Sequence, residues 1–108
     1  MPAYRNSTSG SITASAGAVT LAYRNFANGA AGVQVTGTFT GTIELQTTLD
    51  GTNYVAIQGI NVNSGTATAS ITAVGIYRFE LVGSLSVRAY ASAWTSGTAV
   101  VTLVGLEG

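Results

Sequence analysis

The stretch that decides the fold class is Val33–Leu49, which reads VQVTGTFTGTIELQTTL. Its odd positions are apolar or glycine, apart from Thr47, and its even positions are threonine, glutamine or glutamate. A period of two is typical of a β-strand that lays one face on a core and turns the other to solvent. Its 17 residues exceed the length of an ordinary strand. We therefore expect Gly37 or Gly41 to mark a bulge, a bend between sheets or a tight turn.

Shorter patterns of the same kind predict strands on both sides of this stretch, and no segment carries the period of a helix. A strand is expected over residues 19–23, and a loop over 25–32 because Asn28-Gly29 tolerates positive φ. The segment Asp50-Gly51-Thr52-Asn53 is interpreted as a turn. Further strands, some of them weakly indicated, are expected over residues 54–57, 60–62, 67–72, 75–82, 85–91 and 98–104.

The last third of the chain suggests a hairpin. A loop over residues 83–85 would place Leu81 opposite Val87 and Phe79 opposite Ala89 on the inner face, and Glu80 opposite Arg88 outside. The segment 98–104 is apolar at nearly every position, so it is either a central strand or one covered on both faces by another subunit.

These strands predict an all-β, single-domain protein. About seven to nine short strands at this spacing are typical of an antiparallel β-sandwich, immunoglobulin-like or jelly-roll-like, or of a closed barrel. The domain is expected to span residues 1–108, with residues 1–10 as a candidate N-terminal arm. The first residues lack the apolar run of a secretory signal peptide, so secretion by that route is not expected.

The composition argues against most catalytic chemistry. The chain has no cysteine, histidine or lysine, four arginines balance four acidic residues, and only 7% of residues are charged. It therefore lacks the usual nucleophile–base pairs, Schiff-base lysines and transition-metal ligands. We expect no catalytic, cofactor-binding or metal-binding residues. A neutral surface does not attract phosphate groups, so nucleic acid and membranes are not expected partners, whereas self-association is.

The acidic residues offer the remaining candidates for chemistry, namely Glu44, Asp50, Glu80 and Glu107. A glycosidase-like pair would need two of these carboxylates to converge in a cleft, and nothing in their spacing indicates this. The Asp50–Asn53 segment offers oxygens to a calcium ion, but it lacks the acidic residues and the distal glutamate of an EF-hand loop. A plain hairpin turn explains that segment better.

Trp94, the single tryptophan, is placed in or beside a loop within the sequence AWTSG. There it could stack on a sugar, anchor an interface or fold over the end of the core, and these interpretations stay open. The predicted interface residues are Tyr4, Trp94, Leu103, Val104 and Leu106.

One pattern resembles a known family. Residues 35–46 read VTGTFTGTIELQ and run into LDGTNY at 49–54, and GIYRF follows at 75–79. The pattern consists of Gly-x-aromatic-x-Gly, an apolar strand that ends in Gln, Asp-Gly-x-x-aromatic, and Gly-x-Tyr-Arg-aromatic. It resembles the pattern of small β-sandwich virion proteins of tailed bacteriophages. These are head decoration (cement), head-fibre and tail accessory proteins. Tyr54 stands where tryptophan is common among them, and the resemblance transfers no site residues.

The resemblance implies a structural, non-enzymatic role on the virion. The expected function is that of a capsid decoration or cement protein, made in the host cytoplasm and bound to the outer surface of the shell. Its expected partners are the major capsid protein or other virion proteins, and further copies of itself. Alternatives are a tail or neck accessory protein, or a carbohydrate-binding or adhesin module that uses Trp94.

Overall fold

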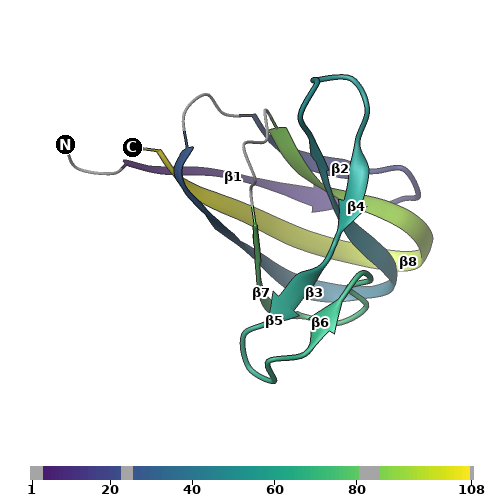
Figure 1. Ribbon diagram of the computed structural model, residues 1–108. Coiled ribbons are helices and arrows are strands. Elements are labelled where there is room, and N and C mark those ends of the chain that lie inside the picture. Colours follow the sequence, from purple (N-terminus) through teal and green to yellow (C-terminus); the bar gives the residue numbers. More distant parts are fainter. Residues whose placement is uncertain (1–3, 23–25, 81–85, 108) are drawn as a thin grey trace.

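The computed structural model of the chain describes residues 4–22, 26–80 and 86–107. These residues form eight strands and no helix (Figure 1). The strands are β1 (Tyr4–Ile12), β2 (Ala18–Ala22), β3 (Phe26–Thr48), β4 (Val55–Ile57), β5 (Gly59–Asn61), β6 (Ala67–Thr68), β7 (Gly75–Glu80) and β8 (Ser86–Glu107). No described helix is therefore available to cross a membrane.

Two long strands, β3 and β8, organise the whole molecule. They have 23 and 22 residues and pair antiparallel along most of their length, from Thr48 opposite Ser86 to Phe26 opposite Glu107. All eight strands belong to one sheet, in the order β1-β8-β3-β7-β5-β6, with β2 added to β8 and β4 to β3. Every strand pair is antiparallel.

The paired strands β3 and β8 bend sharply near their middle. The register shifts between Thr40 and Gly41 and again between Thr42 and Ile43. Each shift leaves one extra residue in β8, first Thr95 and then Ser92. A bulge of this kind bends a strand and increases its twist. Because there are two insertions, the odd-numbered residues of β8 face the core on both sides of the bend.

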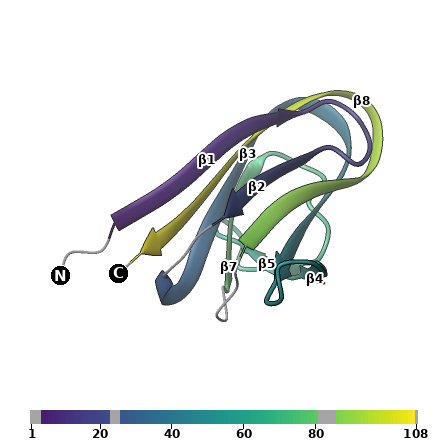
Figure 2. The same cartoon turned by 90° about the horizontal axis from the view of Figure 1, so that it is seen from above.

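The bend folds the single sheet into two layers, which Figure 2 shows most clearly. The first layer contains β1, the second half of β8, the first half of β3, and β7, β5 and β6. The second layer contains β2, the first half of β8, the second half of β3, and β4. The core between them consists of Ile12, Val19, Leu21, Val33, Val35, Ile43, Leu45, Ile71, Tyr77, Phe79, Val87, Ala89, Ala91, Ala99, Val101 and Leu103.

Glycines make the bend possible because neighbouring backbone lies where a side chain would begin. Gly37 and Gly97 have φ of 99° and 93°, in the region that L-residues rarely adopt. A Cβ on Gly97 would meet the Thr38 carbonyl and the Cα of Phe39. Gly41 has the Trp94 ring directly against it. The expected irregularity at Gly37 or Gly41 is therefore confirmed as a bend between two layers.

The all-β, antiparallel, single-domain prediction is confirmed, but several local predictions are wrong. The expected loop over residues 25–32 belongs to β3 from Phe26 onward. The expected strands over 85–91 and 98–104 are parts of one strand, β8. That strand is central, since β1 and β3 pair with it on either side over residues 99–105. Residues 4–10, part of the segment considered as an N-terminal arm, lie in β1.

The predicted hairpin that would place Glu80 opposite Arg88 does not form. Glu80 pairs with Ala30 of β3, in the first layer. Arg88 lies in the second layer, between Thr20 of β2 and Gln46 of β3. Leu81 and the predicted loop at 83–85 lie outside the described residues. Cross-strand matching of side chains favoured the hairpin, but β7 finds its partners in β3 and β5 instead.

Candidate functional site

The outward side of the first layer is the broadest candidate for a binding surface. We call three of its central rows the uncharged face, since all but one of their residues are uncharged. Reading across the sheet, its rows come from β1, β8, β3 and β7. Its residues are Ser7, Val104, Gly32 and Arg78 in one row, Ser9, Thr102, Gln34 and Ile76 in the next, and Ser11, Val100 and Thr36 in the third. Arg78 carries the one charge among these side chains.

The centre of the uncharged face is a shallow hollow over Gly32. Because Gly32 has no side chain, Val104 and Ile76 rise on either side of it, with Gln34 and Thr102 beside them. Ile76 is 52% exposed and Val100 41% exposed. Val62 lies next to this row, since its N–H donates to the Ile76 carbonyl, and it is 59% exposed. Clustered apolar side chains in solvent are typical of an interaction surface.

The outward side of the second layer has a different character. We call its central group the arginine cluster, formed by Arg88, Tyr54, Tyr90, Gln46 and Glu44. The Arg88 guanidinium lies 4.0 Å from the centroid of the Tyr54 ring and 4.8 Å from that of Tyr90. Its Nε donates to Gln46 Oε1 at 2.7 Å, and Gln46 Nε2 donates to Glu44 Oε1 at 3.1 Å.

The arginine cluster is held together by its own members. Each cation–π contact contributes about 0.5–1 kcal/mol near a surface. The Tyr54 hydroxyl donates to Ser86 Oγ, which in turn donates to the Leu21 carbonyl of β2. The cluster therefore ties the loop before β4 to the sheet.

Asp50 organises that loop, as the turn interpretation predicted. Its Oδ1 accepts hydrogen bonds from the Thr52 and Asn53 amides, both at 2.8 Å, and from Thr48 Oγ1. Its Oδ2 accepts from Asn53 Nδ2 at 2.9 Å. The bonds from Asn53, and then those from Thr52 and Thr48, lower the pKa of the Asp50 carboxyl far below its usual range. Both carboxylate oxygens thus serve the turn.

Trp94 lies inside β8 at the bend, so its placement in or beside a loop is wrong. Its indole stacks on the Phe39 ring, with centroids 5.2 Å apart and planes 4° from parallel. Its Nε1 donates to the Gly97 carbonyl at 3.2 Å. Trp94 is half-buried against the core, which corresponds to the interpretation of a tryptophan folded over the end of the core.

The other predicted interface residues lie in the paired strands β1 and β8, near the start of β1 and the end of β8. Leu103 is fully buried in the core, so its side chain offers no surface to a partner. Val104, its neighbour in β8, lies on the uncharged face. Tyr4 and Leu106 belong to adjacent strands where β1 begins and β8 ends, and Tyr4 pairs with Glu107 (Figure 1). Of the predicted interface residues whose side chains the structure describes, Val104 is the one on the uncharged face.

Sequence reasoning missed Ile76 and Gly32, although a signal for Ile76 was present. In the segment Gly75–Phe79, the aromatic Tyr77 and Phe79 mark the inward side, so Ile76 had to face outward. Gly32 was assigned to a loop and therefore was not placed in a sheet.

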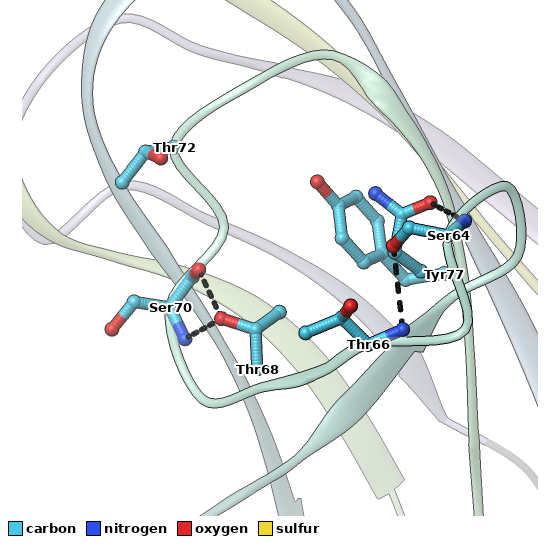
Figure 3. Close-up of a pocket in the computed structure, with 7 residues that line it drawn as sticks. Ser64, Thr66, Thr68, Ser70, Thr72 and Tyr77 are labelled. Atoms are coloured by element: carbon cyan, nitrogen blue, oxygen red, sulfur yellow. Dashed lines mark hydrogen bonds between the residues drawn. The ribbon is translucent and has the colours of Figure 1, made fainter.

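A polar hollow lies at the segment of the chain that connects β5 to β7 (Figure 3). It is lined by Asn61, Ser64, Thr66, Thr68, Ser70, Thr72 and Tyr77. Most of these polar groups already bond the local backbone. Asn61 Oδ1 accepts from the Asn63 amide at 2.9 Å, and Thr68 Oγ1 both accepts from the Ser70 amide and donates to the Ser70 carbonyl. No charged side chain lines the hollow. In the described part of the chain, no three acidic, histidine or cysteine side chains gather to hold a metal.

No protein-family model matches the sequence, and no curated protein matches it. Two solved structures have a similar fold at low sequence identity. The SPBc2 prophage-derived protein YomS aligns over 99% of this chain and 96% of its own, with a TM-score of 0.79 and 17% identity. The PBSX exported protein XepA aligns over 95% of this chain and 38% of its own, with a TM-score of 0.78 and 17% identity. The chain thus spans nearly all of YomS and under half of XepA, and these likenesses establish the fold.

Proposed function

We propose that the chain is a structural protein of a tailed-bacteriophage virion, and that it acts as a decoration or cement protein on the outside of the capsid. The observation that carries this proposal is the uncharged face, where Ile76 and Val100 are exposed and Ile76 and the partly buried Val104 flank the Gly32 hollow. The motif resemblance to phage virion proteins and the fold shared with a prophage-derived protein support it.

The proposed binding is physically simple. Fully burying one Val or Ile side chain contributes about 1.5–3 kcal/mol. A few such side chains, against the entropy cost of association, give modest affinity per copy. On a shell the same contact repeats many times, so linked copies would bind much more tightly than one copy alone. Because the face carries one charged side chain, covering it removes little of the water that hydrates charged groups.

The proposal is tested by binding of the purified protein to shells that lack it, measured by co-sedimentation. Ile76→Glu should abolish binding, because a charge would be buried at the centre of the face. The matched control is Val55→Glu, since Val55 is 65% exposed and lies on β4 in the other layer. Equal loss of binding in both variants, or no binding by the unchanged protein, would contradict the proposal.

The capsid surface and the neck or tail are distinguished by copy number. Quantitative mass spectrometry of purified particles should find hundreds of copies for a shell protein, and about six or twelve for a neck or tail protein. The low number would move the proposal to the accessory-protein alternative without changing the face that binds.

The hydroxyl-lined hollow favours one further candidate function, carbohydrate binding. Thr66 and Thr72 line it. A glycan array would test this candidate, with Thr66→Ala/Thr72→Ala as the hollow variant and Trp94→Ala as the control for the original tryptophan hypothesis. A sugar signal that only the hollow variant loses would favour this function over the structural one.

A further inference from the structure

The four edges of the sandwich differ greatly in length. In the first layer the edge strands are β1, with 9 residues, and β6, with 2. In the second layer they are β2, with 5 residues, and β4, with 3. Very short edge strands are one way in which proteins prevent edge-to-edge association. The edges at β4 and β6 are protected in this way, whereas β1 is the longest of the four edge strands.

Strand β1 also lacks the other common protections of an edge. Its register with β8 is regular from Tyr4 opposite Glu107 to Ile12 opposite Ala99, so no bulge turns it away. It contains neither proline nor lysine, and its one charged residue, Arg5, lies near its start, so residues 6–12 carry no charge. Among the described residues β1 pairs with β8 alone. Alternate backbone N–H and C=O groups along β1 therefore point away from the sheet without a strand to accept them.

We propose that β1 pairs antiparallel with β1 of a second copy, centred on Ser9, and so joins the first layers of two copies into one continuous sheet. Backbone hydrogen bonds along an exposed edge are an established source of affinity between chains. The proposal concerns association of this chain with itself, and it does not depend on the proposed virion role.

The outward side of β1 fits a second copy because its exposed residues Ser7, Ser9 and Ser11 read the same in both directions around Ser9. In the proposed register Ser9 faces Ser9 of the partner subunit, each Ser7 faces a Ser11, and each Thr8 faces a Gly10. In a twofold contact the same surface serves both copies, so that surface must be self-complementary. Pairing with a strand of a different protein carries no such requirement. Ser7, Ser9 and Ser11 are exposed, and Ser9 Oγ lies 2.7 Å from Thr102 Oγ1, which holds it on the outward side.

The pairing has a consequence for the uncharged face. Residues directly opposite in a sheet point to the same side. The uncharged faces of the two copies would therefore lie side by side and point in the same direction, and Ile76, on β7, is separated from the junction by β3 and β8. Ile76→Glu should consequently leave the pairing intact, which separates this proposal from the virion proposal.

The register is tested with a single cysteine, since the natural chain has none. Under mild oxidation Ser9→Cys should form a disulfide-linked dimer, because the two sulfurs would face each other across the axis. The matched control is Thr20→Cys, an exposed position on the shorter edge strand β2, which should remain monomeric. Dimers from both variants, or from neither, would overturn the proposal.

A charge-swap experiment tests the same contact without a covalent bond. Ser9→Lys and Ser9→Glu should each weaken the dimer about fivefold in analytical ultracentrifugation, because like charges would face each other. Mixing the two variants should restore association. Circular dichroism melting confirms that both fold. A monomeric unchanged protein up to near-millimolar concentration, or a dimer insensitive to both charges, would overturn the proposal.

Discussion

The two layers share one core and one pair of long strands, yet their outward sides differ in what their side chains do. On the second layer, Arg88, Tyr54 and Gln46 bond one another and fix the loop before β4. On the first layer, Ile76 and Val100 are exposed to solvent, and Ser9 and Thr102 hydrogen-bond each other. The same architecture thus uses one outward side for its own stability and leaves the other open.

Because of this difference, stability and binding can be altered separately in a small β-sandwich. Substitutions in the arginine cluster should change the free energy of unfolding, whereas substitutions on the uncharged face should change association. Substitutions can test this separation. The first one disturbs the bend and should therefore affect both faces.

Gly97→Ala should have the largest effect, because it disturbs the bend that folds the sheet into two layers. The new Cβ would meet the Thr38 carbonyl and Phe39 Cα at a backbone with φ of 93°. We expect a loss of about 3 kcal/mol in the free energy of unfolding, measured by urea denaturation. Gly65→Ala is the control, since Gly65 has φ of 76° with open space around it, and it should lose only about 1 kcal/mol. Equal losses would show that backbone conformation alone, without the close approach, governs the bend.

Arg88→Ala and Arg78→Ala compare the same residue type on the two faces. Arg88→Ala removes two cation–π contacts and the bond to Gln46, so we expect a loss of about 1–2 kcal/mol. Arg78 is exposed on the uncharged face, and its removal should change stability by less than about 0.5 kcal/mol. Thermal melting of both variants decides the matter. A larger effect at Arg78 would contradict the division between the faces.

The stability of the Asp50 loop should fall in acid. The pKa of Asp50 is lowered in the folded chain, so its contribution is complete above the unfolded value of about 3.9 and is lost as pH falls below it. The melting temperature of the unchanged protein should therefore drop below about pH 4 more steeply than that of Asp50→Asn. High salt should alter this difference little, because direct hydrogen bonds cause the shift. Parallel pH profiles for the two proteins would contradict it.

Ala16→Gly should give the smallest effect, and a stabilising one. Ala16 has φ of 67° in the connection from β1 in the first layer to β2 in the second, where its N–H bonds the Ala91 carbonyl at 2.9 Å. Glycine relieves the backbone cost but gains freedom in the unfolded chain, so we expect a net gain of about 0.5 kcal/mol. Ala14→Gly should instead lose stability, and both are measured by chemical denaturation. Neither should change association.

The fold class could be predicted from the sequence, because the alternation of apolar and polar residues is local. The strand partners could not be predicted in this way. Val33, Val35, Ile43 and Leu45 were placed on one face correctly, and all four are buried. The partner of β7 was wrong, because a short loop between residues 80 and 86 favours a hairpin on local grounds alone. Whether that connection crosses between layers depends on the bend in β3 and β8, which is a property of the whole sheet.

The candidate surface was predicted only at Val104. Leu103 and Val104 are both apolar, and without the register of β8 the sequence could not say which of them faces the core. The arginine cluster was not predicted, since Tyr54, Arg88 and Gln46 come together only when β3, β8 and the loop before β4 are side by side. Side-chain contacts of this kind depend on tertiary structure.

The pairing of β1 and β3 with β8 also governs the order in which the chain can fold. Strands β1, β2 and β3 all use β8 as a partner, and β8 is the last of the eight strands to be synthesised. A nascent chain therefore holds the long strand β1 without its partner until the residues of β8 have been made. Such non-local pairing folds slowly and leaves strand edges exposed meanwhile. Rapid completion of β8, or a chaperone that covers β1, would then determine the yield of folded protein.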